Sequence, residues 1–246
     1  MDFERINPVA LVSGATFGAG AACAHPLAFG ADGGLILIDR DAAALDTLAD
    51  RFGNHAPERV SLLAHDGGDD DAWWARAGGF IKDQYGRLDW AVLNACAPRA
   101  GAGDLIEFNR AGAQIDAVQR ALRTVMPLMR FNSQGGAIVI VAAAAGLKPD
   151  AGLLATVRTA AKEGASGDIR INAVALGEAP GAIQSFQDTL RDTGSERAAF
   201  EIIANLSPPL ARFGPVADIN ALIMPMLTGQ TPVSGVTLVV DGGDEV

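Results

Sequence analysis

Short runs of aliphatic and β-branched residues recur along the chain, separated by longer segments with helical periodicity. Continuous apolar runs of this kind are typical of strands buried on both faces of a sheet, and their alternation with helices indicates parallel pairing. We predict strands near Val9–Val12, Leu35–Ile38, Val60–Leu63, Trp90–Leu93, Ala137–Val141, Ile169–Val174 and Val236–Val240. The pattern therefore predicts an α/β protein: a doubly wound, seven-stranded parallel sheet with helices on both faces.

No shift in composition, internal repeat or low-complexity stretch divides the 246 residues, so we expect a single domain that spans residues 1–246. The longest interruption, residues 178–208, follows the carboxyl end of a predicted strand. Ligands lie at that edge in doubly wound sheets. We interpret 178–208 as a substrate lid, with an ordinary surface excursion as the alternative.

The net charge of −10 argues against nucleic acid or an anionic membrane surface as a partner, because both select a basic face. No apolar run approaches the about 20 residues that span a bilayer, and the N-terminus lacks the order of a signal peptide. The two cysteines, Cys23 and Cys96, lie in apolar stretches and are expected to be buried thiols. Together these features lead us to expect a cytoplasmic protein. The spacing of His25, His55 and His65 does not match a metal site, so we expect no bound metal.

The first predicted strand leads into a glycine-rich turn, Ser13–Gly20, and then into a helical pattern. Glycines at such a turn let backbone amides approach a pyrophosphate at the helix N-terminus. Asp39 ends the second predicted strand, where a carboxylate can accept from both ribose hydroxyls and repel a 2′-phosphate, which favours NAD over NADP. The guanidinium of Arg40 weakens that preference. Pro26 interrupts the helical pattern, so we expect the helix either to kink after Cys23 or to begin a new segment there.

The spacing Gly-x-x-x-Gly-x-Gly in this turn resembles the short-chain dehydrogenase/reductase family, and the resemblance continues along nearly the whole chain. Leu93–Cys96 is similar to the end of the family's fourth strand, and Pro209–Gly214 and Val240–Gly243 are similar to its closing motifs. The resemblance implies a Rossmann fold and an NAD(H) cofactor. The cofactor contacts that it implies are Ser13, Gly14, Phe17, Gly18, Gly20, Asp39, Asp66 and Asn94.

The resemblance also implies four catalytic side chains, and here the chain departs from the family. Lys162 matches the family's lysine, but Arg158 stands at the tyrosine position, Ala143 at the serine position, and Gln114 or a neighbour at the asparagine position. A guanidinium group is too weak an acid to shuttle a proton. An alanine methyl group cannot donate a hydrogen bond to a carbonyl oxygen. The chain's one tyrosine, Tyr85, lies on the approach to the fourth strand.

The altered positions belong to the nicotinamide and substrate end of the site, whereas the adenosine and pyrophosphate positions match the family. We therefore expect a catalytically degenerate member that serves as the non-catalytic subunit of an NAD-dependent alcohol or hydroxyacyl dehydrogenase assembly. Two alternatives stay open: an active NAD(H)-dependent enzyme with an unorthodox proton donor, and an NAD(H)-binding sensor. Gly164 and Gly167 predict an early end for the helix that carries Lys162. That change would reshape one of the surfaces through which subunits of the family pair. We expect an oligomer, formed either by identical subunits or with an active homologue.

Two local predictions concern the segment after the third strand. Asp69–Asp71 should open a helix, because carboxylates interact favourably with the helix dipole. Of the adjacent Trp73 and Trp74, one ring is expected to face inward and the other to lie near the surface.

Overall fold

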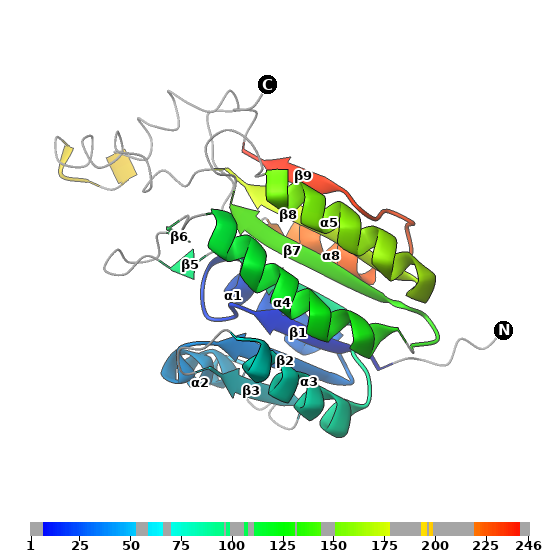
Figure 1. Cartoon of the computed structure of the whole chain (residues 1–246). Coiled ribbons are helices and arrows are strands. Elements are labelled where there is room, and N and C mark those ends of the chain that lie inside the picture. The colour runs from blue at the N-terminus through cyan, green and yellow to red at the C-terminus, as the bar shows by residue number, and fades with distance from the viewer. Residues whose placement is uncertain are drawn as a thin grey trace.

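A computed structural model of the chain describes residues 7–52, 59–65, 70–95, 97–98, 106–107, 111–130, 132–143, 151–177, 193–195, 197–198 and 219–241. Seven parallel strands form one sheet in the order β3-β2-β1-β4-β7-β8-β9 (Figure 1). Their bounds are β1 (Val9–Ser13), β2 (Gly34–Asp39), β3 (Val60–Ala64), β4 (Trp90–Asn94), β7 (Gly136–Ala143), β8 (Ile169–Leu176) and β9 (Thr237–Val240). Each strand lies where the apolar pattern predicted it, so the doubly wound parallel sheet is confirmed.

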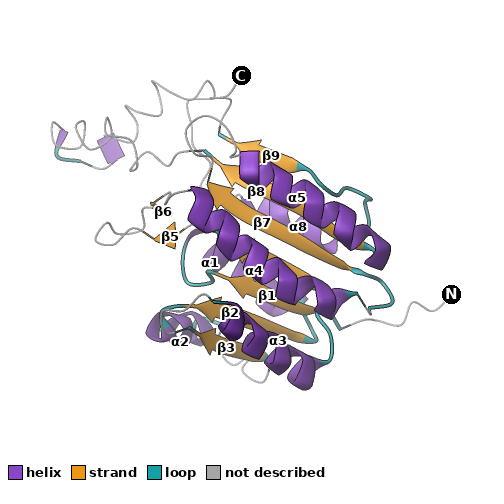
Figure 2. Ribbon diagram, viewed as in Figure 1, coloured by secondary structure: helices purple, strands orange, loops and turns teal. Residues whose placement is uncertain are grey.

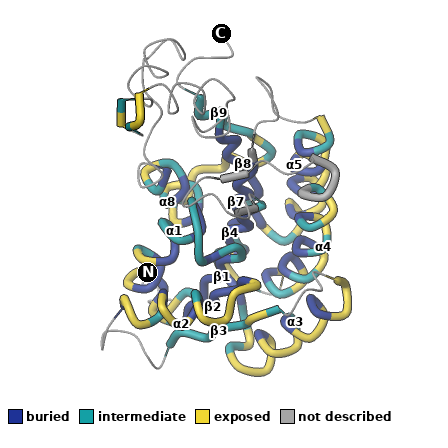
Figure 3. Tube along the Cα trace, turned by 90° about the vertical axis from the view of Figure 1, so that its left-hand side faces the viewer, coloured by how far each residue is buried: buried dark blue, intermediate teal, exposed yellow. Residues whose placement is uncertain are grey.

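Helices cover both faces of the sheet (Figures 2 and 3). They are α1 (Gly18–Gly30), α2 (Ala42–Asp50), α3 (Asp71–Tyr85), α4 (Ala111–Met129), α5 (Ala151–Gly164) and α8 (Asn220–Thr228). Helices α3, α4 and α5 share one apolar core with the strands, and α1, α2 and α8 share the other. Two further strands of two residues each, β5 (Ala97–Pro98) and β6 (Ile106–Glu107), pair antiparallel outside this sheet. Among the described residues, no helix is long and apolar enough to cross a membrane.

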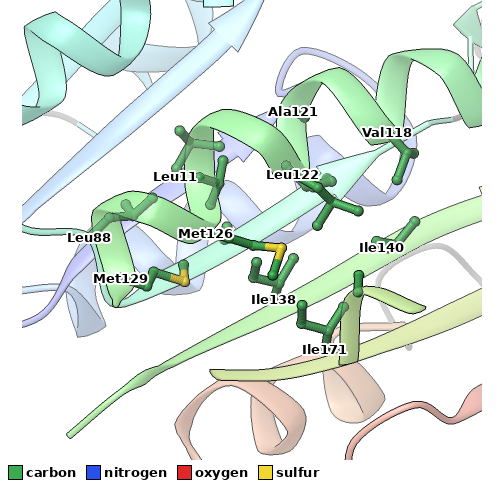
Figure 4. Close-up of a cluster of buried hydrophobic side chains, with 14 of the residues drawn as sticks. Leu11, Leu88, Val118, Ala121, Leu122, Met126, Met129, Ile138, Ile140 and Ile171 are labelled. Carbon is green, nitrogen blue, oxygen red and sulfur yellow. The ribbon is translucent and has the colours of Figure 1, made fainter. Parts of the chain in front are cut away.

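The alternation of side chains along each strand explains why the strand sequences read as continuous apolar runs. Leu11 of β1 packs into the core under α4, whereas its neighbours Ala10 and Val12 pack into the core under α1. All three are fully buried. Figure 4 shows the first core, in which Leu122 and Met126 of α4 lie against the strands. A strand buried on both sides needs apolar residues at every position, and this need is the signal that the sequence carries.

Helix α3 begins as the carboxylate run predicted, but its tryptophans differ from the expectation. Asp70 is the N-cap, and its carboxylate accepts a hydrogen bond of 2.7 Å from the Trp73 amide. The prediction that one of the two rings lies near the surface is wrong: Trp73 is 8% exposed and Trp74 is 5% exposed. The rings pack edge to face with centroids 5.3 Å apart. Both fit because α3 packs against the sheet and also against α4, which widens the buried arc of the helix.

Two further helix expectations concern α1 and α5. Helix α1 runs unbroken from Gly18 to Gly30, so no new segment begins after Cys23. Helix α5 ends early, as expected, at Gly164. A short 3-10 turn, η2 (Ala165–Gly167), and Asp168 in the left-handed conformation (φ 53°) then lead directly into β8. The early end of α5 is therefore confirmed.

Candidate functional site

The predicted cofactor residues gather at the carboxyl edge of the sheet, around β1. In the strand order, β1 lies between β2 and β4, so the crossover connections run in opposite directions from it. In doubly wound sheets, ligands bind in the crevice at this switch point. The Ser13–Gly20 turn leaves the carboxyl end of β1 at this place and leads into α1.

The glycines of the turn are required by close backbone approach. Gly14 has a φ of 60°, in the left-handed region that disfavours residues with a side chain. At Gly20, an added Cβ would lie 1.9 Å from the Gly14 carbonyl oxygen. The first turn of α1 therefore packs directly on the backbone that leaves β1, and no room is left between them for a side chain. The N-cap, Phe17, makes no side-chain capping bond, so the first amides of α1 have no partner from that side chain. This arrangement fits a pyrophosphate.

Asn94, at the carboxyl end of β4, fixes the shape of the turn. Its amide nitrogen, Nδ2, donates to the carbonyl oxygen of Gly14 at 3.1 Å and to that of Phe17 at 3.4 Å. The side chain is nearly buried, with a residue exposure of 9%. The register of β1 and β4 pairs Ser13 with Leu93, which brings Asn94 beside Gly14. Asn94 thus acts on the site by holding the turn, a role that its sequence position alone did not specify.

Asp39, at the end of β2, is held by a residue of the turn that the sequence did not single out. One carboxylate oxygen, Oδ2, accepts from the Thr16 amide at 2.9 Å and from the Thr16 hydroxyl at 2.8 Å. The other, Oδ1, accepts from the Arg40 amide at 2.7 Å. A further bond, from the Ala15 amide to the Ile38 carbonyl oxygen, ties the same turn to β2. The predicted ribose-binding carboxylate and the pyrophosphate turn are therefore one connected structure.

Asp66 lies outside the described residues, and so does Cys96. Ser13 and Phe17 are half-buried residues at the start and end of the described turn. Of the predicted cofactor contacts, the structure brings together those of β1, the turn, β2 and β4.

The predicted catalytic positions lie on three elements. Ala143 is the last residue of β7 and Gln114 lies in the first turns of α4, and the side chains of both are outside the described part of the structure. Arg158 and Lys162 lie one helical turn apart on α5, as predicted, and both are exposed. The buried face of that helix carries Leu153, Thr156, Val157, Ala160, Ala161 and Gly164. The Arg158–Lys162 pair is therefore on the side of α5 that faces away from the sheet.

The buried face of α5 holds a polar contact that the sequence did not reveal. The Gln119 side chain of α4 donates from Nε2 to the Thr156 hydroxyl at 3.2 Å. Thr156 is only 9% exposed. The hydrogen bond gives this buried hydroxyl group a partner from the neighbouring helix. Both residues stand in helices with strong apolar periodicity, so only the packing of the two helices shows that they meet.

The tyrosine has a structural role at the opposite edge of the sheet. Tyr85 is the last residue of α3, and its hydroxyl lies 2.7 Å from the hydroxyl of Ser61 in β3. Its ring packs on Gly34, the first residue of β2, where an added Cβ would lie 2.3 Å from the ring. Since Gly34 opens its strand, Tyr85 lies at the amino edge, whereas the Gly14 turn is at the carboxyl edge. Within the part of the chain described above, no cluster of side chains could hold a metal ion.

Comparison with known proteins agrees with this geometry. The sequence profile of the short chain dehydrogenase family matches residues 8–189. A trans-4-hydroxycyclohexanecarboxylate dehydrogenase of Sinomonas cyclohexanicum is 28% identical over 256 aligned residues, which cover 96% of this chain and 92% of that protein.

Solved structures share the fold. The crystal structure of levodione reductase superposes with a TM-score of 0.74 at 24% identity and covers 97% of this chain and 98% of its own. L-sorbose reductase from Gluconobacter frateurii, solved with NADPH and L-sorbose, gives a TM-score of 0.76 at 23% identity, with 100% of this chain and 99% of that chain covered. The parallel sheet, the glycine turn on Asn94 and the family profile across most of the sequence lead to one conclusion: the chain belongs to the short-chain dehydrogenase family of oxidoreductases.

Proposed function

We propose that this protein binds NAD(H) but does not carry out the family's proton transfer, and that it serves as the non-catalytic subunit of an NAD-dependent dehydrogenase assembly. The position of Tyr85 is the observation that carries the proposal. The chain has one tyrosine, and it is bonded to Ser61 at the amino edge of the sheet. No other segment of the sequence, whatever its structure, can bring a phenol to the carboxyl edge.

The nucleotide part of the proposal rests on the turn and on Asp39. Gly14 and Gly20 let the first turn of α1 pack directly on the backbone that leaves β1, with the N-terminus of the helix at the carboxyl edge. Asp39 ends β2 as a carboxylate that is 8% exposed. A negative charge there can accept from ribose hydroxyls and opposes a 2′-phosphate, which favours NAD(H) over NADP(H). NAD(H), when bound, supplies the hydride acceptor or donor. The residues of this chain bind and orient it.

The proposed loss of proton transfer rests on the residues at the predicted catalytic positions. General acid–base catalysis contributes about 10²- to 10⁴-fold in rate, and oxyanion donors contribute a comparable factor. Ala143, at the serine position, has no hydroxyl group to donate. Arg158, at the tyrosine position, carries a guanidinium group in place of a phenol and lies on the exposed face of α5. Lys162 shares that face, so a replacement proton donor would have to come from elsewhere in the chain.

The subunit role is the part of the proposal that extends furthest. Helix α5 ends at Gly164, and η2 leads directly into β8. The surface formed by α4 and α5 is therefore shorter than it would be if α5 continued. A surface reshaped in this way favours a partner of complementary length over a second identical copy. A non-catalytic subunit that still binds NAD(H) would retain the glycine turn and the fold that holds it.

The second candidate is an active enzyme with an unorthodox donor, and the dehydrogenase relative from Sinomonas cyclohexanicum favours it, because that alignment spans nearly the whole chain. Because Lys162 lies on the exposed face of α5, another residue, such as Lys148, or a bound water would then have to pass the proton. The third candidate, an NAD(H) sensor, needs the glycine turn and no chemistry.

Calorimetry with NADH and NADPH, followed by absorbance assays at the nicotinamide band, separates these candidates. The substrate panel should contain alcohols and ketones, including trans-4-hydroxycyclohexanecarboxylate and L-sorbose. We expect micromolar to millimolar NADH binding, weaker NADPH binding and no turnover. Native mass spectrometry of the chain mixed with an intact family homologue from the same genome should then detect a hetero-oligomer.

Each outcome decides one part. Absence of heat with NADH at millimolar concentration would remove the nucleotide role and the sensor. Turnover of any panel member that survives Arg158→Ala would show that the chain is an enzyme with its own proton route. Homo-oligomers alone, with every intact homologue tested, would remove the subunit role.

A further inference from the structure

Pro26 removes one backbone donor from the middle of α1. In an α-helix, each carbonyl accepts from the amide four residues later, so the donor for the Ala22 carbonyl would be residue 26. Proline has no N–H, and in a helix interior it also crowds the carbonyl four residues before it. Helix α1 nevertheless continues unbroken past Pro26 to Gly30. The Ala22 carbonyl therefore needs a hydrogen-bond donor from outside its own helix.

Asn220, the first residue of α8, supplies that donor from 198 positions away in the sequence. Its side-chain amide nitrogen, Nδ2, donates to the Ala22 carbonyl oxygen at 2.6 Å. The contact is partly buried, and α8 packs beside α1 on the same face of the sheet. The side chain thus serves as the donor that a backbone N–H would provide in a helix without proline.

Cys23 fixes the orientation of the same amide. Its thiol donates to the Asn220 side-chain oxygen, Oδ1, at 3.1 Å. Cys23 is fully buried, and burial raises the pKa of its thiol to about 12, so the thiol keeps its proton and remains a donor. If the amide of Asn220 were turned over, its oxygen would face the Ala22 carbonyl oxygen and its NH2 group would face a donor. The two contacts therefore allow only one orientation.

We propose that Asn220 is a positioning residue: its side chain replaces the helix hydrogen bond that Pro26 removes and so holds α1, the helix of the glycine turn, against the start of α8. Pro26 and Asn220 form a compensating pair, in which each residue is costly without the other. Proline alone would leave a carbonyl without a donor. Asparagine alone would place an unpaired amide between two helices.

The link bears on the cofactor site because of where Ala22 lies. The carbonyl is one turn beyond Gly18. The bond that closes the first turn of the helix runs from the Ala21 amide to the Phe17 carbonyl oxygen. A loosened second turn would leave the amides of the first turn less well aimed at a pyrophosphate. This consequence rests on the proposed NAD(H) binding, whereas the pairing itself does not.

A double-mutant cycle tests the pairing. Asn220→Ala should raise the unfolding equilibrium constant about tenfold, in line with a partly buried carbonyl that has lost its donor. In a Pro26→Ala background, the restored N–H serves the Ala22 carbonyl, so the same change should have less than about a threefold effect. Thr228→Ala, at the exposed end of α8, is the control and should have equal effects in both backgrounds. Urea unfolding followed by circular dichroism measures all five proteins and the wild type.

Two further variants distinguish the two contacts of the amide. Asn220→Asp can accept from the thiol but cannot donate to the carbonyl, so it should be at least as harmful as Asn220→Ala. Cys23→Ala should have the smaller effect, because a thiol is a weak donor. If Asn220→Ala fails to accumulate as folded protein, the Pro26→Ala change should recover it.

The outcomes are decisive in each direction. Additive effects of Asn220→Ala and Pro26→Ala, or wild-type stability in Asn220→Asp, would overturn the pairing, as would failure of the double variant to fold. NADH titration then tests the positioning role: Asn220→Ala should weaken binding at least threefold, and Pro26→Ala should restore it. A wild type that binds no NADH would defeat the proposed function while the unfolding cycle still decides the pairing. A coupled cycle with unchanged NADH affinity would limit Asn220 to a structural role and overturn its positioning role.

Discussion

Replacing Gly20 by alanine should damage the glycine turn, because the added methyl group has no room there. The new Cβ would lie 1.9 Å from the Gly14 carbonyl oxygen, 2.8 Å from its carbonyl carbon and 3.0 Å from the Asn94 amide nitrogen. Real Cβ atoms do not approach backbone atoms this closely, so the helix start and the strand end must move apart by about 1 Å or more. No flexible side chain can absorb that movement, because the nearest contacts are backbone atoms.

The expected loss of stability follows from two effects. Overpacking of a tight site costs about 1–3 kcal/mol. Moving the Gly14 carbonyl also breaks its 3.1 Å bond from Asn94, whose side chain is nearly buried, and an unsatisfied buried amide costs about 1–3 kcal/mol. Alanine regains about 1 kcal/mol over glycine in a helix. The free energy of unfolding should therefore fall by about 1–5 kcal/mol, and NADH binding should be lost because the turn no longer has its shape.

Gly30→Ala is the matched control, because Gly30 is the last residue of the same helix and nothing lies within 4 Å of an added Cβ. It should leave NADH affinity unchanged and alter stability by no more than about 1 kcal/mol, in the stabilising direction. Urea unfolding and NADH fluorescence titration measure both variants. Equal stability and equal NADH affinity in the two variants would show that the close packing of α1 on the Gly14 turn does not govern this site.

Four other predictions concern Tyr85, Cys23 and Asp39. Tyr85→Phe removes the bond to Ser61 and should lower the free energy of unfolding by about 1 kcal/mol without changing NADH affinity; altered affinity would place the tyrosine in the site. Cys23 should resist alkylation at pH 8 in a Cys96→Ser variant, and rapid labelling of the folded protein would contradict its burial. Because burial raises its pKa from 9.0 to about 12, the Cys23 contribution to stability is complete below pH 9 and is lost as the pH rises towards 12, which unfolding at stepped pH measures. Asp39→Asn removes a charge that opposes a 2′-phosphate, so the ratio of NADH to NADPH affinity should fall; an unchanged ratio would mean that the carboxylate does not face the ribose.

Much of the fold followed from the sequence because the strands are buried on both sides. A strand such as Leu35–Ile38 must be apolar at every position to contribute to two cores, and its run stands out against the periodic helices on either side. The ends of strands were less certain. The structure extends β8 to Leu176, beyond the predicted Val174, because its partner β7 continues to pair with it as far as Ala143.

The local geometry of the predicted cofactor site also followed from the sequence, since Gly14, Gly20 and Asp39 stand at fixed distances along one strand–turn–helix–strand unit. Local spacing determines local geometry. The same reasoning failed where the outcome depends on which helices pack together. It did not predict that Trp73 and Trp74 are both buried, or that the Thr16 hydroxyl donates a hydrogen bond to the carboxylate of Asp39.

The sequence by itself determined the sheet, the glycine turn and the place of the chain's one tyrosine just before the fourth strand, because each depends on residue identity and short-range order. Only the tertiary structure decided how α1 tolerates Pro26. The answer lies in Asn220, whose hydrogen bond to the Ala22 carbonyl joins segments far apart in the chain. A proline in a predicted helix indicates that one carbonyl lacks its backbone donor, but the donor that replaces it can come from any element that packs nearby. Its identity is settled by the arrangement of α1 and α8 on the sheet.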